Sequence, residues 1–115
     1  MLKVGVIGVG SMGQNHARIY SEMGCLAGVN DAFPDSAKHV AKRLGTNVFD
    51  TVDELLANVD AVSICTPTTS HFGVAKKAIE MGVATLVEKP FTGDETQART
   101  LCELAEANKV TLASG

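Results

Sequence analysis

Three glycines near the start of the chain have the spacing of a phosphate-binding turn. Gly8, Gly10 and Gly13 form the pattern Gly-x-Gly-x-x-Gly between the apolar residues 2–7 and a helix-like stretch over residues 11–23. In a strand, turn and helix arrangement, the first glycine allows a tight turn, the second lets the backbone approach a pyrophosphate, and the third lets the helix pack closely. The free N–H groups and the positive dipole end of that helix then face the phosphates.

An acidic residue about 20 positions further on is the second part of this pattern. Asp31 lies there, at the end of a second apolar segment over residues 26–31. Its carboxylate is expected to accept hydrogen bonds from the adenosine ribose hydroxyls and to repel a 2′-phosphate. Residues 32–34 (Ala-Phe-Pro) contain no arginine that could bind that phosphate. The sequence therefore predicts binding of NAD in preference to NADP.

Strand-like and helix-like segments alternate along the chain, as in a parallel sheet with crossover helices. The expected strands cover residues 2–7, 26–31, 47–49, 61–65, 84–87 and 110–113. The expected helices cover residues 11–23, 35–44, a short segment after residue 51, 70–81 and 94–108. Gly45 is expected to end the second helix, and Thr51 and Glu54 to form a capping box. The buried stripe of the last helix is expected to include Ala98, Leu101, Cys102 and Ala105.

Six strands with right-handed crossovers predict an α/β fold, a doubly wound Rossmann sheet in the order 3-2-1-4-5-6. In that order the topological switch point lies between strands 1 and 4. Ligands of such sheets bind beyond the carboxyl ends of the strands at the switch point. The glycine turn and the segment Thr66-Pro67-Thr68 should therefore form opposite walls of one crevice.

Length and composition exclude several classes of protein. The 115 residues fit one dinucleotide-binding domain, residues 1–115, but are few for a whole dehydrogenase. The net charge is −3 and the ten basic residues are scattered, so a nucleic-acid partner is not expected. No apolar run approaches 18 residues and the N-terminus has no signal-peptide layout. We expect a cytoplasmic protein without a membrane span.

The cysteines and histidines do not form a recognisable site in the sequence. Cys25, Cys65 and Cys102 are widely spaced, with no CxxC pair, and are expected to be reduced core thiols. No group of potential ligands has metal-binding spacing, so no metal site is predicted. His16 and His71 could each act as a base, but a partly buried histidine that is hydrogen-bonded to backbone is the more common arrangement.

Together these motifs resemble those of the Gfo/Idh/MocA oxidoreductases, named for glucose-fructose oxidoreductase and inositol dehydrogenase. The resemblance covers essentially the whole chain and rests on the glycine turn, Asp31, Cys-Thr-Pro-Thr-Thr-Ser-His at residues 65–71, and Glu-Lys-Pro at residues 88–90. Two departures are Thr68, where the family often has Asn, and Ala-Thr at residues 84–85, where it often has His-Val. The contact of the Thr68 loop with the nicotinamide end therefore stays open.

The resemblance implies a domain that binds NAD, or less readily NADP, in an enzyme that oxidises a sugar, polyol or nucleotide-sugar hydroxyl or catalyses the reverse reduction. It also implies a second, mainly β-sheet domain that carries an acid–base histidine and forms homo-oligomers, and that domain is absent from this chain. The expected cofactor-binding residues are Gly8, Gly10, Ser11, Met12, Gly13, Asp31, Thr66, Pro67, Thr68, His71, Glu88 and Lys89.

Lys89 is the expected catalytic residue. An ammonium group at the carboxyl end of a strand can hydrogen-bond a substrate hydroxyl and stabilise its developing negative charge. Glu88 either contacts the nicotinamide ribose or orients Lys89, and the sequence leaves both possibilities open. An alternative function is an NAD-sensing regulatory module, which has no need of Lys89.

Overall fold

The computed structural model describes residues 2–89 and 94–114, and in it six parallel strands form one sheet in the order β3-β2-β1-β4-β5-β6. This confirms the predicted fold class and strand order. The strands are β1 (Val4–Ile7), β2 (Leu26–Asn30), β3 (Asn47–Val48), β4 (Ala61–Ile64), β5 (Ala84–Val87) and β6 (Leu112–Ser114). The helices are α1 (Ser11–Glu22), α2 (Pro34–Leu44), α3 (Val52–Ala57), α4 (Thr68–Glu80) and α5 (Glu95–Asn108).

Local sequence signals set most of these boundaries. Pro34 occupies the first turn of α2, where the fixed φ of proline suits a helix start, so α2 begins one residue earlier than expected. Gly45 ends that helix with a φ of 69°. Thr51 caps α3, because its side chain accepts a hydrogen bond of 3.0 Å from the backbone N–H of Glu54.

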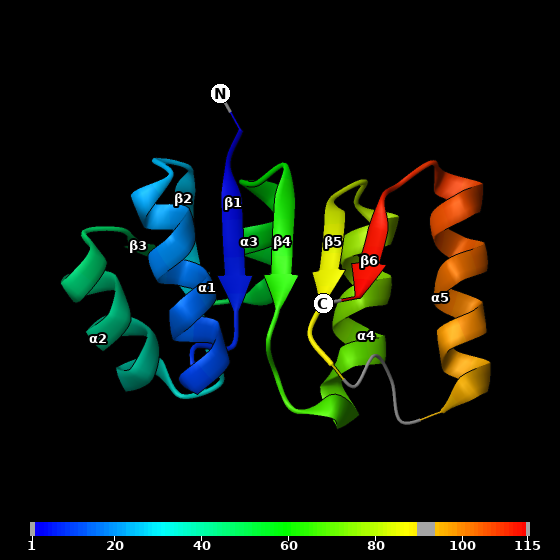
Figure 1. Cartoon of the computed structure of the whole chain (residues 1–115), viewed down its shortest axis with the longest axis horizontal. Helices are drawn as coiled ribbons and strands as arrows, with labels where there is room; N and C mark the ends of the chain where they lie inside the picture. The colour runs from blue at the N-terminus through cyan, green and yellow to red at the C-terminus, as the bar shows by residue number, and fades with distance from the viewer. Residues whose placement is uncertain (1, 90–93, 115) are drawn as a thin grey trace.

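Helices cover the sheet on both faces, as Figure 1 shows: α1 and α2 lie in front of the strands on the β1–β3 side, and α3 and α4 lie behind the sheet. Each layer encloses an apolar core. The core under α1 and α2 contains Val6, Val29 and Val40, and the larger core on the other face contains Ile64, Ile79 and Leu101. All four residues of β1 are buried, as expected for a central parallel strand that is covered on both faces.

The C-terminal segment differs from the expectation in two respects. Strand β6 begins two residues later than predicted, because Lys109 adopts a left-handed conformation after α5 and the N–H of Val110 still bonds to the carbonyl of Ala105 at 2.9 Å. Cys102 is exposed, which corrects its assignment to the buried stripe, whereas Leu101 and Ala105 are buried there as predicted. The Cys102 thiol thus lies just outside the buried stripe of α5, because tertiary packing decides which side of the helix faces the core.

In Figure 1 the front of β4–β6 carries no helix among the described residues. A hollow of about 320 Å³ opens there, and nearly all of its lining atoms are apolar. The lining residues include Val4, Tyr20, Ala84, Leu86 and Ala113. Part of the interior face of the sheet is therefore open to solvent.

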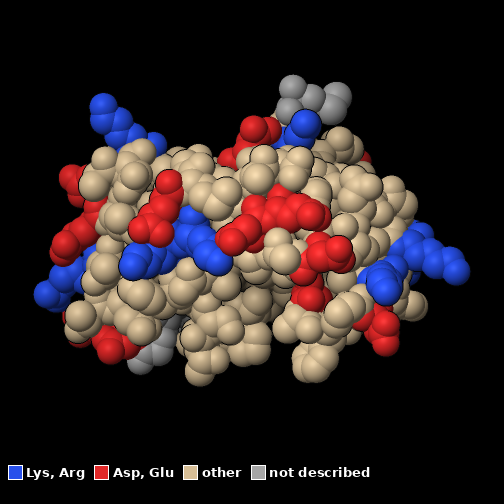
Figure 2. Space-filling view, turned by 180° about the vertical axis from the view of Figure 1, so that it is seen from behind, with Lys and Arg blue, Asp and Glu red and all other residues tan. Residues whose placement is uncertain are grey.

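The opposite face of the molecule is charged without one dominant sign. Figure 2 shows basic and acidic side chains interspersed over it. An ion pair between α4 and α3 joins the Nζ atom of Lys77 to a carboxylate oxygen of Asp53 at 2.9 Å. Within residues 2–89 and 94–114, no helix has the length and apolar character needed to cross a membrane.

Candidate functional site

Two of the three glycines in the turn are required by close packing. Gly8 has a φ of +90°, and a Cβ atom there would lie 2.8 Å from the backbone of Cys65 and Thr66. A Cβ atom at Gly13 would lie only 1.7 Å from the carbonyl oxygen of Gly8. A Cβ atom at Gly10 would meet no atom within 4 Å. The turn therefore packs tightly against α1 and the end of β4, while Gly10 presents bare backbone to open space.

That open space is part of a crevice of about 620 Å³ between the carboxyl ends of β1 and β4. Its walls confirm the predicted juxtaposition of the glycine turn with Thr66 and Pro67. The lining residues are Gly8, Gly10, Ser11, Met12, Asp31, Ala32, Phe33, Ser36, Cys65, Thr66, Pro67 and Ser70. The crevice lies at the switch point of the sheet, where an open α/β fold binds its ligand.

Asp31 connects the two parts of the nucleotide-binding pattern. It follows β2 directly, one residue beyond the end of the strand. Its Oδ2 accepts a hydrogen bond from the N–H of Val9 at 2.8 Å, and its Oδ1 accepts one from the N–H of Phe33 at 2.8 Å. Each carboxylate oxygen has a second acceptor site, so both remain able to accept from ribose hydroxyls.

Thr66 supplies a buried hydroxyl group to one wall of the crevice. Its Oγ1 atom is buried and has no hydrogen-bond partner among the described residues. Because an unpaired buried hydroxyl is costly, such an atom on a crevice wall indicates a place where a ligand or a water molecule bonds.

Two residues that were expected to bind cofactor, Thr68 and His71, do not line the crevice. Thr68 begins α4 and is not among the residues that line the crevice. His71 is only 1% exposed, and its Nε2 lies 2.7 Å from the carbonyl oxygen of Thr66. His71 therefore does not line the crevice and supports the Thr66 loop from behind, and its contact with a cofactor stays a prediction. This bond to backbone is the arrangement that the sequence predicts for His71.

His16 belongs to a chain of side-chain hydrogen bonds instead. Its Nε2 lies 2.6 Å from Oε2 of Glu88, and its Nδ1 lies 3.1 Å from the buried Oγ of Ser63, which in turn lies 2.5 Å from the hydroxyl of Tyr20. The prediction of a backbone partner for His16 is therefore wrong. For Glu88 the structure gives a partner that neither sequence alternative included.

Glu88 and Lys89 directly follow β5 at the same edge of the sheet. The N–H of Glu88 donates to the carbonyl of Ile64 at 3.0 Å, which fixes the backbone at this point. Glu88 is half-buried, and Lys89 is exposed beside it. Pro90, the last residue of the expected motif, lies outside the described residues. Neither Glu88 nor Lys89 lines the crevice at the switch point.

Cys65 lies between these two groups of residues. It lines the crevice, and it also forms a cluster with His16 and Glu88 in which the potential ligand atoms all lie within 4.8 Å of one another. Burial and, to a smaller extent, the charge of Glu88 raise the pKa of the Cys65 thiol to about 12. Spacing along the sequence could not reveal this cluster, because its members come from α1 and from the ends of β4 and β5.

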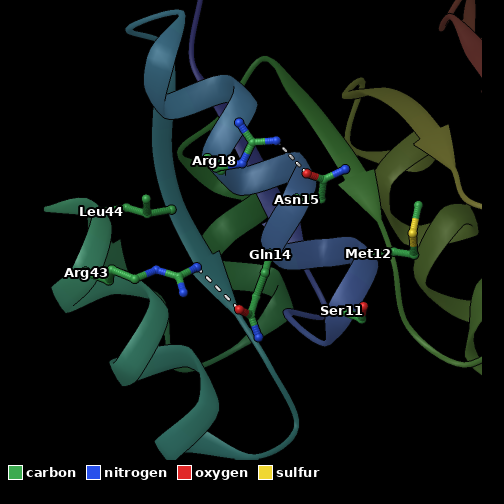
Figure 3. Close-up of a pocket in the computed structure, with 7 residues that line it drawn as sticks. All are labelled: Ser11, Met12, Gln14, Asn15, Arg18, Arg43 and Leu44. Carbon is green, nitrogen blue, oxygen red and sulfur yellow. Dashed lines mark hydrogen bonds between the residues drawn. The ribbon is translucent and has the colours of Figure 1, made fainter.

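A second hollow, of about 500 Å³, lies between α1 and α2 (Figure 3). Its polar side chains bond to one another: Arg43 donates to Gln14 at 3.3 Å, and Arg18 donates to Asn15 at 2.7 Å. It shares only Ser11 and Met12 with the crevice. The tight glycine turn and the unpartnered hydroxyl are features of the crevice, which we take as the candidate site.

The residues of the crevice fit a dinucleotide. Gly10 leaves room for a pyrophosphate at the start of α1, Asp31 can accept from ribose hydroxyls, and Thr66 has a hydroxyl available on the opposite wall. The donors, the acceptors and the shape therefore agree with the sequence pattern.

Comparison with known proteins also indicates a dinucleotide-binding domain. The model of the GFO_IDH_MocA family, described as "Oxidoreductase family, NAD-binding Rossmann fold", matches residues 2–115. UDP-N-acetylglucosamine 3-dehydrogenase of Acidithiobacillus ferrooxidans is 47% identical over 114 residues, which are 99% of this chain. An inositol 2-dehydrogenase of Rhizobium meliloti is 34% identical over 118 residues, again with 99% of this chain covered. The chain spans 36% of the length of each of these two relatives.

Solved structures agree with the sequence comparison. The structure of the Acidithiobacillus enzyme matches 99% of this chain and 38% of its own, with a TM-score of 0.97. GenD2 from gentamicin A biosynthesis, solved in complex with NAD, is 35% identical, with a TM-score of 0.94 over 99% of this chain and 34% of its own. KijD10, a 3-ketoreductase from Actinomadura kijaniata solved with NADP, is 27% identical, with a TM-score of 0.89 over 99% of this chain and 37% of its own.

Proposed function

The chain belongs to the GFO_IDH_MocA oxidoreductase family as an NAD-binding Rossmann domain, and on this basis we propose that it is the cofactor-binding domain of a dehydrogenase acting on a sugar, polyol or nucleotide-sugar hydroxyl. The named relatives support this substrate class, because they include an inositol dehydrogenase and a UDP-sugar dehydrogenase. Since these relatives are almost three times as long, we also propose that the substrate pocket and oligomer contacts of the whole protein belong to a further domain.

One observation carries this proposal: a single crevice collects Gly10, Asp31 and Thr66, each with a group suited to a different part of a dinucleotide. Gly10 offers backbone without a side chain at the pyrophosphate position. Asp31 offers two carboxylate oxygens that the N–H groups of Val9 and Phe33 hold in place. These residues bind and orient, and they perform no chemistry themselves.

Lys89 is the residue that we propose for chemistry in the intact protein. A bound nicotinamide cofactor supplies the hydride acceptor for oxidation of an alcohol. The ammonium group of Lys89 is exposed at the edge of the sheet, so it can hydrogen-bond a substrate hydroxyl there. Glu88 is bonded to His16, so we propose that it fixes the backbone from which Lys89 extends.

We further propose a cytoplasmic location, which three free cysteines without a disulfide among the described residues support. The apolar hollow on the open face of β4–β6 supports association of the intact protein through this side of the sheet.

Calorimetric titration of NAD into the 115-residue chain tests the proposed function. We expect saturable binding with one site per chain, and loss of that binding in Gly10→Asp, which adds a negatively charged side chain at the pyrophosphate position. A Gly73→Asp variant is the matched control, because Gly73 is exposed in α4, has open space at its Cβ position and is not part of the crevice. Equal NAD affinity in Gly10→Asp and wild type would contradict the proposed binding site.

A further inference from the structure

We propose that His16, Cys65 and Glu88 form a binding site for a borderline-soft divalent cation such as Zn²⁺. The three side chains come from α1 and from the ends of β4 and β5, and all are half-buried. They offer an imidazole nitrogen, a thiol sulfur and a carboxylate oxygen, with the ligand atoms within 4.8 Å of one another. A metal here would replace the bond between His16 and Glu88 that the proposed function uses to position Lys89, so the test measures the metal itself and not enzyme activity.

The combination of ligands selects the class of metal. Thiolate, imidazole and carboxylate are the ligands of zinc sites, whereas Mg²⁺ and Ca²⁺ prefer oxygen ligands alone. Zinc bonds of about 2.0–2.3 Å in a tetrahedral site separate neighbouring ligands by roughly 3.3–3.8 Å. The 2.6 Å contact between His16 and Glu88 must therefore open by about 1 Å. Side-chain rotation can supply movements of this size without a change in the backbone.

The surroundings of His16 orient it as a ligand. Its Nδ1 contacts the buried Oγ of Ser63 at 3.1 Å, and the hydroxyl of Tyr20 contacts the same oxygen at 2.5 Å. Glu88 can only accept as a carboxylate, so the 2.6 Å contact places a proton on Nε2 in the metal-free chain. A metal that binds Nε2 replaces this bond, and the ring proton then lies on Nδ1, which donates to Ser63. Such outer hydrogen bonds commonly fix the tautomer and the ring orientation of a ligating histidine.

The charges of the ligands match those of a divalent cation. When the metal–sulfur bond forms, the thiol proton is released to solvent, and the thiolate and carboxylate together balance the two positive charges. Water can complete the coordination on the crevice side, because Cys65 lines the crevice.

Titration of the 115-residue chain with Co²⁺, a spectroscopic substitute for Zn²⁺, tests this site. We expect a sulfur-to-cobalt charge-transfer band in the near ultraviolet and visible bands of a tetrahedral ion. Zn²⁺ should displace Co²⁺, since it binds the same type of site more tightly. A folded wild-type chain, checked by circular dichroism, that gives no charge-transfer band at millimolar Co²⁺ would overturn the proposal.

Variants then identify the ligands. Cys65→Ser should abolish the charge-transfer band, whereas Cys102→Ser, which removes an exposed thiol elsewhere, should retain it. Glu88→Gln should weaken Co²⁺ binding at least tenfold, and Ser63→Ala should weaken it by about 10- to 100-fold through loss of the outer hydrogen bond. A band that disappears in Cys102→Ser and persists in Cys65→Ser would show that the cation binds elsewhere.

Discussion

The carboxylate of Asp31 accepts a hydrogen bond of 2.8 Å from the backbone N–H of Val9, in the centre of the glycine turn. The residue that we propose to discriminate between NAD and NADP therefore also anchors the turn that we propose to bind the phosphates. Because its second oxygen bonds to Phe33, the carboxylate has a defined orientation before any ligand binds. Preorganisation of this kind lowers the entropic cost of binding.

We expect the chain to bind NAD more tightly than NADP, because the charge of Asp31 repels a 2′-phosphate. Asp31→Ala should weaken NAD binding and narrow the difference between the two cofactors. Asp31→Asn removes the charge and keeps an acceptor for only one of the two N–H groups, those of Val9 and Phe33, so it should also narrow the difference and weaken NAD binding. Calorimetric titration of both cofactors measures this, and tighter binding of NADP to the wild-type chain would contradict the assignment.

Gly13→Ala should destabilise the fold and abolish NAD binding, because its Cβ would overlap the Gly8 carbonyl. The expected loss is at least about 1–3 kcal/mol of unfolding free energy, the usual cost of overpacking. Gly73→Ala is the control: it lies inside α4 with open space at the Cβ position and should be stabilising by up to about 1 kcal/mol. Urea denaturation compares the two, and a fully stable Gly13→Ala variant would refute the packing argument.

Cys102 should be alkylated by iodoacetamide much faster than Cys65 at pH 8. The thiolate is the reactive form, and burial with the Glu88 charge raises the pKa of Cys65 from 9.0 to about 12, so almost none of it is ionised at that pH. Its reaction rate should rise as the pH approaches 12. Glu88→Gln should accelerate it by removing the charge that disfavours the thiolate. Mass spectrometry of the labelled peptides measures both rates, and equal rates at pH 8 would contradict this prediction.

In the intact protein, Lys89→Ala should leave NAD affinity nearly unchanged and lower kcat/KM by about 100-fold or more, the usual effect of losing a positioned acid–base or electrostatic contact. The 115-residue chain alone should bind NAD without turnover. Steady-state kinetics on the intact enzyme and an NADH absorbance assay on the chain test these statements. Near wild-type activity of the Lys89 variant would remove this residue from the mechanism.

The open face of β4–β6 should cause the isolated chain to associate as its concentration rises, because the hollow there is lined almost entirely by apolar atoms. Leu86→Thr should reduce association, since it adds a hydroxyl to this face while keeping a residue suited to a strand. Size-exclusion chromatography with light scattering measures the mass. A strictly monomeric wild-type chain at high concentration would show that the exposed area is too small to bind a second copy.

Much of the fold and half of the site follow from the sequence alone. The alternation of segments and the spacing of Gly8, Gly13 and Asp31 are short-range patterns, and they predict the strand order and the crevice between β1 and β4. The prediction of the strand order succeeds because helix and strand periods, turn geometry and the handedness of crossovers are local constraints. Few arrangements of parallel strands satisfy all of them.

The tertiary structure alone decided which side chains meet at the edge of the sheet. His16 and Glu88 are 72 positions apart, and His16 and Ser63 are 47 apart, so no period in the sequence connects them. Packing also placed His71 behind the Thr66 loop and turned Cys102 outward. Contacts of this kind depend on how far each helix is rotated and shifted against the sheet, and that rotation is set by the sum of many core contacts. The sequence by itself determined the fold and the nucleotide-binding turn, and only the folded chain determined the hydrogen-bonded cluster beside it.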